Sequence, residues 1–147
     1  MQAIQISRTA LDVEWRRLEL IAQNLANINS ARTQDGTLYQ AQSLITGPKG
    51  AFTNHLNSSA ESETKTDIDS LSGVAVYGVQ SDKAEPRLVH EPGNPQADTN
   101  GFVSYPNIDQ ASQMTLMMKT SRAYEANIVM LNIAKQMYGK ALELGAK

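Results

Sequence analysis

The chain has 147 residues, no cysteine, a formal charge of −2 and 5% aromatic residues. The absence of cysteine excludes disulfides, thiolate nucleophiles and cysteine-bound zinc, and the nearly balanced charge gives no general attraction to nucleic acid. Charged residues interrupt every early apolar run and no stretch approaches roughly 20 apolar residues, so we expect neither a cleaved signal peptide nor a membrane span.

The first predicted element is an amphipathic helix within residues 1–28. Its apolar residues recur at steps of three, four and seven, which places them on one helix face at the period of a coiled-coil seam. These predicted seam residues are Ile4, Leu11, Trp15, Leu18, Ala22 and Leu25. A stripe of this kind packs against another helix, either of its own chain or of a neighbour.

The middle of the chain, residues 29–107, is predicted to be a loop with a small β-rich region. All five prolines and seven of the nine glycines lie between Gly36 and Pro106. The polar stretch 46–72 holds too little apolar surface to offset its ordering entropy, so we expect it to be flexible. Short extended segments are predicted at 38–45, 74–79, 87–90 and 102–105.

The second predicted helix covers residues 108–147. Asn107 and Gln110 have the spacing of a capping box, so Asn107 is expected to cap this helix. Its seam repeats at steps of three and four without a break, and the abundant methionine suits adaptable contacts. The seam positions are Met114, Met117, Ser121, Tyr124, Ile128, Leu131, Lys135, Tyr138 and Leu142, and all of them except Ser121 and Lys135 are predicted assembly residues.

These elements predict a mainly α fold with a small β-rich middle. The N- and C-terminal helices are expected to pair as a coiled-coil-like hairpin, with the irregular and β segment inserted between them. Because the second helix exceeds the first by about ten residues, the two stripes cannot bury each other completely. Residual apolar residues need neighbours, which favours assembly over a self-contained hairpin; examples are Met114, Met118, Ile133 and Met137.

No pattern in the sequence predicts catalysis, a cofactor or a metal site. His55 and His90 have no partner at metal-ligand spacing, and the calcium-loop-like segment from Asp67 has Gly78 where a glutamate is needed. No serine lies in a nucleophile elbow and no phosphate-binding loop is present. We therefore expect no enzyme, no cofactor, no small-molecule substrate and no nucleic-acid partner.

Several short motifs are similar to those of one protein family. Asn24-Leu25-Ala26-Asn27 resembles the signature shared by axial proteins of the bacterial flagellum, and the long link from Asn29 to Tyr39 narrows the resemblance to the FlgC family of proximal-rod proteins. Further motif residues follow that family in order. They are Pro92, Gly93, Pro95, Tyr105, Pro106, Asn107, Ser121, Arg122, Tyr124 and Asn127.

The resemblance implies a structural subunit of the proximal rod of the flagellar basal body. Such a subunit polymerises through its terminal helices into the periplasmic drive shaft, which transmits torque for motility. Implied partners are copies of the chain itself and other rod proteins, together with the export gate and rod-assembly proteins during secretion by the flagellar type III apparatus. The pattern alone leaves open a soluble helical adaptor or export chaperone, and supports an amphipathic membrane-surface helix less well.

Overall fold

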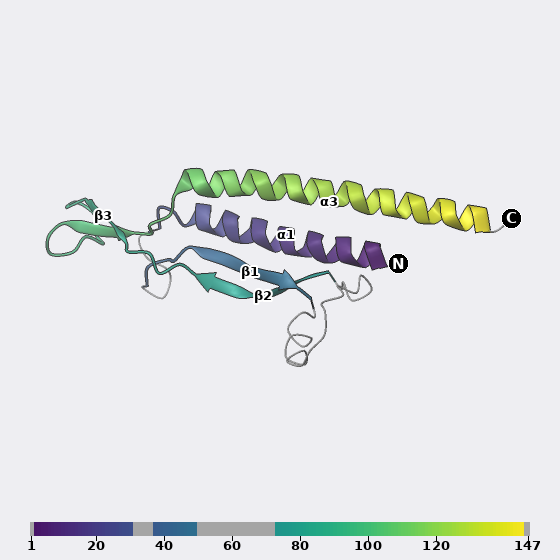
Figure 1. Ribbon diagram of the computed structural model, residues 1–147. Helices are drawn as coiled ribbons and strands as arrows, with labels where there is room; N and C mark the ends of the chain where they lie inside the picture. The colour runs from purple at the N-terminus through teal and green to yellow at the C-terminus, as the bar shows by residue number, and fades with distance from the viewer. Residues whose placement is uncertain (1, 31–36, 50–72, 146–147) are drawn as a thin grey trace, which may run out of the picture. The chain divides into compact units, whose positions relative to one another are not determined.

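The computed structural model describes residues 2–30, 37–49 and 73–145, and their elements alternate from helix to strands to helix (Figure 1). In chain order they are α1 (Gln2–Ala26), β1 (Gln42–Pro48), β2 (Val74–Ser81), β3 (Arg87–His90), β4 (Phe102–Tyr105) and α3 (Gln110–Gly145). β1 pairs with β2, and β3 pairs with β4, each as a two-stranded sheet. The predicted mainly α fold with a small β-rich middle is confirmed.

The contacts divide the chain into two compact units. Of the described residues, unit 1 contains 2–15, 45–49, 73–78 and 121–145, and unit 2 contains 16–30, 37–44 and 79–120. Each unit therefore holds part of α1, part of the β1–β2 pair and part of α3.

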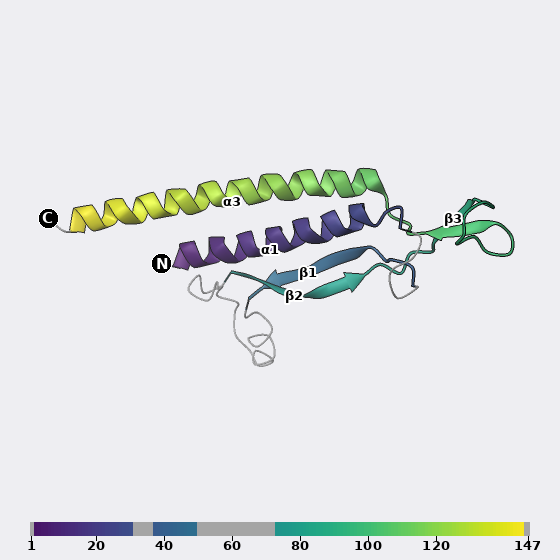
Figure 2. The ribbon, with the colours of Figure 1, turned by 180° about the vertical axis from the view of Figure 1, so that it is seen from behind.

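Unit 1 joins the first half of α1 to strand residues and to the second half of α3. Val13 is its buried apolar residue, with 5% of its surface exposed. The rings of Trp15 and Tyr124 have centroids 6.3 Å apart and link the two helices, which run in opposite directions here (Figures 1 and 2). The Tyr77 hydroxyl donates to the Pro48 carbonyl at 2.6 Å and ties β2 to the end of β1.

A glycine lets the start of β2 lie directly on α1 in unit 1. Gly73 has a φ of +93°, and a Cβ built there would overlap the hydroxyl of Thr9. That hydroxyl oxygen accepts the N–H of Val74 at 3.1 Å while donating to the carbonyl of Ile6 at 2.7 Å. Glycine is needed here both for its left-handed backbone and for its missing side chain.

Unit 2 contains the β3–β4 hairpin, whose strands pair antiparallel with Val89 opposite Val103. Val103 is 1% exposed and Pro106 is also buried, so this side of the hairpin faces the interior. Leu88, which lies on the other side of the hairpin, is 63% exposed. The second half of α1 contributes Ile21, at 2% exposure, to the interior of this unit.

Several predicted boundaries were wrong. α1 ends at Ala26, and α3 begins at Gln110 with Asp109 as its cap in place of Asn107. The Asp109 carboxylate accepts the N–H groups of Ala111 and Ser112 at 3.1 and 3.2 Å, and an ionised acceptor at the positive helix end is the stronger cap.

The first predicted strand was also displaced along the chain. The expected segment 38–45 becomes a strand only from Gln42, and β1 continues through residues 46–48, which were expected to be loop. Pairing with β2 supplies the hydrogen bonds that this polar segment lacks by itself, such as Lys49 N–H to the Gly73 carbonyl at 2.9 Å. The rest of the predicted flexible stretch, 50–72, lies outside the described residues, as does 31–36 of the predicted link.

Candidate assembly site

The most unusual surface of the described chain is the apolar surface of α3. Thr120 is the buried residue of this 36-residue helix. Twelve of its large hydrophobic side chains are at least one-third exposed: Met114, Leu116, Met117, Met118, Ile128, Val129, Met130, Ile133, Met137, Tyr138, Leu142 and Leu144. So much uncovered apolar surface on one helix is typical of an interaction site.

In unit 2 the usual polarity of a surface helix is reversed. The covered positions of α3 there are the polar residues Gln113 and Thr120, whereas Met118 is 57% exposed and Met114 is 49% exposed. A self-contained protein turns the apolar stripe of a surface helix toward its own core. The first three turns of α3 therefore present outward the side chains that would normally be covered.

In unit 1 α3 has one covered and one uncovered apolar face. Tyr124 and Leu131 are half-buried, with Asn127 and Ala134 on the same face. A second apolar stripe is uncovered. At 100° per residue, it lies roughly a quarter-turn or more around the helix from the covered face. We call it the outer stripe, and it consists of Met130, Ile133, Met137 and Leu144.

The outer stripe leads into an open hollow along the last turns of α3. Ile133, Met137, Ala141 and Leu144 line it together with Gly139, and its volume is about 710 Å³. Polar side chains stand at its rim, where Lys140 and Glu143 form an exposed ion pair at 3.6 Å. An apolar floor with a polar rim is the anatomy of a protein–protein interface.

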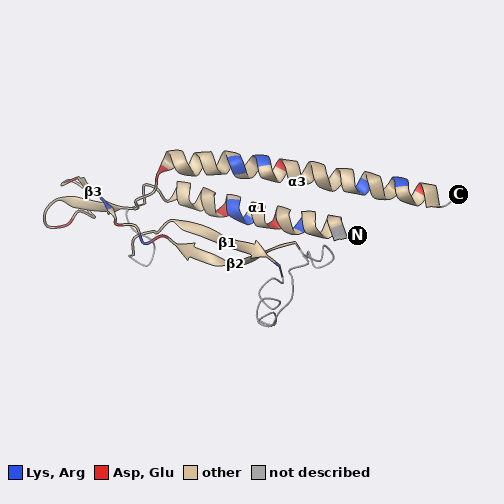
Figure 3. Cartoon of the chain, in the orientation of Figure 1, with Lys and Arg blue, Asp and Glu red and all other residues tan. Residues whose placement is uncertain are grey.

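Charge is sparse along α3. Six of its 36 residues are charged, and the nine residues from 126 to 134 carry no charge at all (Figure 3). Since burying an unpaired charge is costly, an uncharged segment is the part of a helix that a neighbour can cover most favourably.

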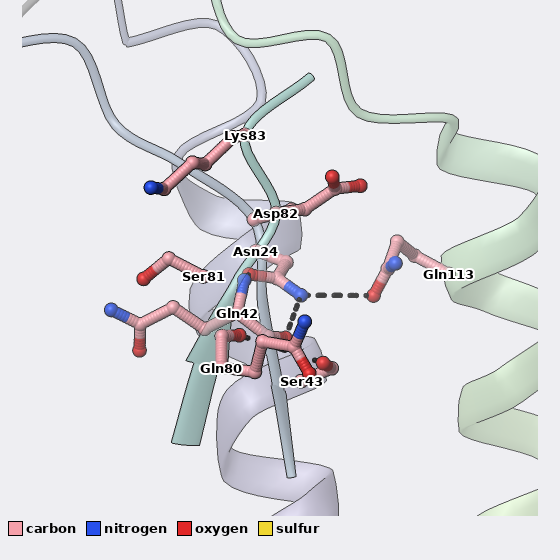
Figure 4. Close-up of a pocket in the computed structure, with 9 residues that line it drawn as sticks. Asn24, Gln42, Ser43, Gln80, Ser81, Asp82, Lys83 and Gln113 are labelled. Atoms are coloured by element: carbon pink, nitrogen blue, oxygen red, sulfur yellow. Dashed lines mark hydrogen bonds between the residues drawn. The ribbon is translucent and has the colours of Figure 1, made fainter. Parts of the chain in front are cut away.

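A buried asparagine organises unit 2 (Figure 4). Asn24 is 2% exposed, and its side-chain oxygen accepts the Gln42 N–H and the Tyr39 hydroxyl, both at 2.9 Å. Its Nδ2 donates to the Gln42 carbonyl at 2.9 Å and to Gln113 Oε1 at 3.2 Å. We call these four residues the Asn24 node, and they tie α1 to the start of β1 and to the first turn of α3.

The Asn24 side chain is a satisfied structural element, since its amide oxygen accepts two hydrogen bonds and its amide nitrogen donates two. All four hydrogen bonds of the side chain stay within unit 2. Burial raises the pKa of Tyr39, which keeps its hydroxyl protonated and able to donate. An open polar cleft of about 680 Å³, lined by Gln42, Gln80 and Asp82 among others, lies beside the node.

The structure covers a different face of α1 from the predicted seam. Trp15 and Ala22 are exposed, and the other predicted seam residues of α1 (Ile4, Leu11, Leu18 and Leu25) are half-buried. The buried residues are Val13, Ile21 and Asn24. Val13 lies one helical turn after Thr9, whose hydroxyl accepts the N–H of Val74 in β2, and Asn24 accepts the N–H of Gln42 in β1. The covered face of α1 is therefore the face that lies on these strands. The sequence analysis missed this face because heptad spacing considers only packing of α1 against another helix and not packing against a sheet.

Some residues of the predicted α3 seam are half-buried and others are exposed. Tyr124 and Leu131 are half-buried, whereas Met114, Met117, Ile128, Tyr138 and Leu142 are exposed. The seam as an assembly surface therefore stays a prediction.

The motif residues are spread over several environments. Pro106 is buried, Tyr105 donates its hydroxyl to Glu91 at 3.1 Å, and Asn27 donates to the Gln23 carbonyl at 2.8 Å. The half-buried motif residues are Leu25, Ser121, Tyr124 and Asn127, and the exposed ones are Ala26, Pro92, Gly93, Pro95, Asn107 and Arg122. Of this set, Asn24 has the densest network of side-chain hydrogen bonds.

Two kinds of site are missing from the part of the chain that the structure describes. None of its helices combines the length and the apolar character that crossing a membrane requires. It also brings together no group of three histidine, aspartate or glutamate side chains that could hold a metal ion.

Comparisons with known proteins agree with one another. The family model described as flagellar basal body rod FlgEFG protein C-terminal matches residues 99–144, a segment that includes all but the last residue of α3. The chain is 36% identical over 145 residues to the flagellar basal-body rod protein FlgC of Salmonella typhimurium, covering 99% of this chain and 97% of the relative. It is 35% identical to the FlgC protein of Escherichia coli (99% and 97% covered) and 30% identical to that of Bacillus subtilis (97% and 96% covered).

Proposed function

The chain belongs to the FlgC family of flagellar basal-body rod proteins, and we propose that it builds the proximal part of the rod by packing the uncovered faces of α3 against neighbouring subunits. It is a structural subunit of the bacterial flagellum, in a family not known for enzymes. The observation that carries the proposal is the contrast on α3 between its single buried residue and its twelve exposed hydrophobic side chains.

The proposed mechanism is mechanical. A fully buried large hydrophobic side chain contributes on the order of 1.5–3 kcal/mol, and every copy would add the same contacts again along the rod. Because such packing is close and interlocked, it resists shear between neighbours collectively. The rod would transmit torque through many modest contacts repeated from subunit to subunit.

In this proposal the two faces of α3 make different contacts, one within the chain and one with a neighbouring subunit. The covered face, with Tyr124 and Leu131, holds the helix to its own chain in unit 1. The outer stripe, from Met130 to Leu144, would be covered by the neighbour. In unit 2, Met114, Leu116 and Met118 would be covered in the same way while the Asn24 node holds the internal register.

Export before assembly fits this arrangement. We propose that the chain leaves the cytoplasm through the flagellar type III apparatus, with the export gate and rod-assembly proteins as transient partners. The buried apolar residues of the described chain are Val13, Ile21, Val103 and Pro106, so few core contacts oppose unfolding for passage. The terminal helices would gain stability when neighbours cover them.

The test compares two adjacent positions on α3. Ile133→Asp places a charge in the outer stripe, whereas Asn132→Asp places the same charge on a neighbouring exposed residue outside it. In a bacterium lacking its own copy of the gene, we expect Ile133→Asp to be secreted but missing from purified basal bodies, with swimming lost. Asn132→Asp should restore both. Normal incorporation of Ile133→Asp would contradict the proposed assembly surface.

A further inference from the structure

The sulfur of this chain is distributed in an unusual way. With no cysteine present, all of it is methionine thioether, and five of the six methionines lie on α3. Methionine ordinarily fills gaps in a core and is shielded there. On α3 the five are exposed to different degrees: Met117 39%, Met114 49%, Met118 57%, Met130 60% and Met137 68%.

Exposed thioethers react with peroxides. The O–O bond of hydrogen peroxide breaks, one oxygen atom forms an S–O bond with the methionine sulfur, and the other leaves as water. The sulfur loses two electrons to the peroxide, so the reaction balances without another reductant or oxidant. The product replaces a flexible apolar side chain with a polar one, and accessible residues react faster.

The two most exposed methionines lie where polarity matters most. Met130 and Met137 belong to the outer stripe, one on each side of Ile133 and two helical turns apart. The adjoining hollow has an apolar floor that includes Met137, Ala141 and Leu144. Gln136 and Lys140 also line this hollow, but they are exposed polar side chains, so a sulfoxide oxygen covered on the apolar floor would exchange water for at most these two donors.

We propose that Met130 and Met137 form an oxidation-sensitive site of the free chain, at which conversion to sulfoxide by hydrogen peroxide prevents α3 from packing against a neighbouring copy. This inference rests on the proposed function, since it assigns a neighbour to the outer stripe. Oxidation has its effect before assembly. Once a neighbour covers the stripe, the sulfurs are shielded and the site no longer reacts.

The first experiment maps the reaction. The purified full-length chain is exposed to hydrogen peroxide for increasing times, and each methionine peptide is followed by its gain of one oxygen atom. The exposed fractions predict that Met137 and Met130 react first, followed by Met118 and Met114, with Met117 the slowest. In denaturant the five rates should become equal. A native order in which Met130 and Met137 lag behind Met117 overturns the site.

The second experiment measures the consequence by sedimentation velocity and light scattering of the same samples. Peroxide should weaken self-association of the wild-type chain by at least about tenfold, which corresponds to about 1.4 kcal/mol. Relative to its own untreated sample, the double variant Met130→Leu, Met137→Leu should lose clearly less association after peroxide than the wild type does. A matched double variant, Met114→Leu with Met117→Leu, should keep most of the wild-type loss.

The outcomes separate this inference from the function on which it rests. Undiminished association of the oxidised wild type, or equal loss by the 130/137 variant, overturns the inference and leaves the assembly proposal standing. An untreated chain that never associates contradicts the assembly proposal and the assembly part of the inference together. The peroxide map still decides in that case whether Met130 and Met137 are the reactive sites.

Discussion

The two helices of this protein use their apolar residues in opposite ways. Among the described side chains of α1, Val13 and Ile21 are buried and Trp15 is the one large hydrophobic residue that is mostly exposed. α3 is eleven residues longer, yet its buried residue is Thr120 and its large hydrophobic side chains are mostly uncovered. The comparison teaches that α1 buries apolar residues within its own chain, whereas α3 leaves most of its apolar residues uncovered, as the proposed contacts with other subunits require.

The most severe test of this difference places the same charge on each helix. Ile21→Asp buries an unpaired carboxylate in unit 2 and should lower the free energy of unfolding by several kcal/mol. Met130→Asp, on an exposed position of α3, should leave thermal unfolding of the free chain nearly unchanged. Circular dichroism melting measures both. Equal destabilisation by the two substitutions would remove the distinction between the helices.

The Asn24 node tests whether α1 holds α3 in register. Asn24→Ala removes the partner of three partly buried groups, the Gln42 N–H and carbonyl and the Tyr39 hydroxyl, and a group that stays buried and unpaired costs roughly 1–3 kcal/mol. Urea unfolding should therefore show a clear loss of stability. Asn27→Ala is the matched control from the same motif, because its hydrogen bond to Gln23 is exposed and its removal should have little effect. Comparable losses in both variants would contradict a special role for the node.

Two glycines of the β2 region make the third comparison. Gly73→Ala forces a side chain into a left-handed backbone and against Thr9 on α1, and strain of this kind costs of order 1–3 kcal/mol. Gly78→Ala meets no atom within 4 Å and should be nearly neutral. Denaturant midpoints of the two variants measure the difference. A neutral Gly73→Ala would mean that α1 does not need this close contact.

The smallest expected effect concerns the beginning of α3. Hydrogen bonds from Ser112 and Ala111 hold the pKa of Asp109 below its ordinary value of 3.8. The stabilisation by this cap is therefore fully present above that ordinary value and is lost as the pH falls through the lower folded-state pKa. Asp109→Ala should reduce helicity above this range and flatten its acid dependence, as followed by circular dichroism.

The matched variant for this cap is Asp109→Asn, since asparagine caps helices through the same geometry without titrating. It should retain helicity and lose only the acid dependence. Loss of helicity in Asp109→Asn equal to that in Asp109→Ala would show that the cap does not depend on an acceptor at this position.

Local patterns in the sequence were enough to predict much of the fold. The helical repeats at both ends predicted α1 and α3, and the clustering of proline and glycine predicted a non-helical middle. These features depend on residues within one or two turns of each other, which is why they can be read without coordinates. Helix boundaries were less accurate: Asp109 and Asn107 are both good caps, and only geometry shows which one the first turn uses.

The candidate site could be predicted only in part. The resemblance singled out Asn24, but nothing local connects it to Gln42 or to Gln113, which lies 89 residues away in the chain. The expected surplus of apolar residues on α3 appears as the exposed outer stripe. Which stripe of α1 becomes covered was missed, since heptad spacing says nothing about a sheet lying beside the helix.

The sequence by itself determined that the chain has two amphipathic terminal helices, a β-rich middle and more apolar helical surface than one copy can bury, because periodicity and composition are local properties. The tertiary structure decided which faces are used: α1 turns Val13, Ile21 and Asn24 toward its own chain, and α3 leaves its outer stripe open. The physical reason is that burial depends on which distant segments meet, and here those contacts are anchored by a few specific groups such as Thr9, Gly73 and the Asn24 node.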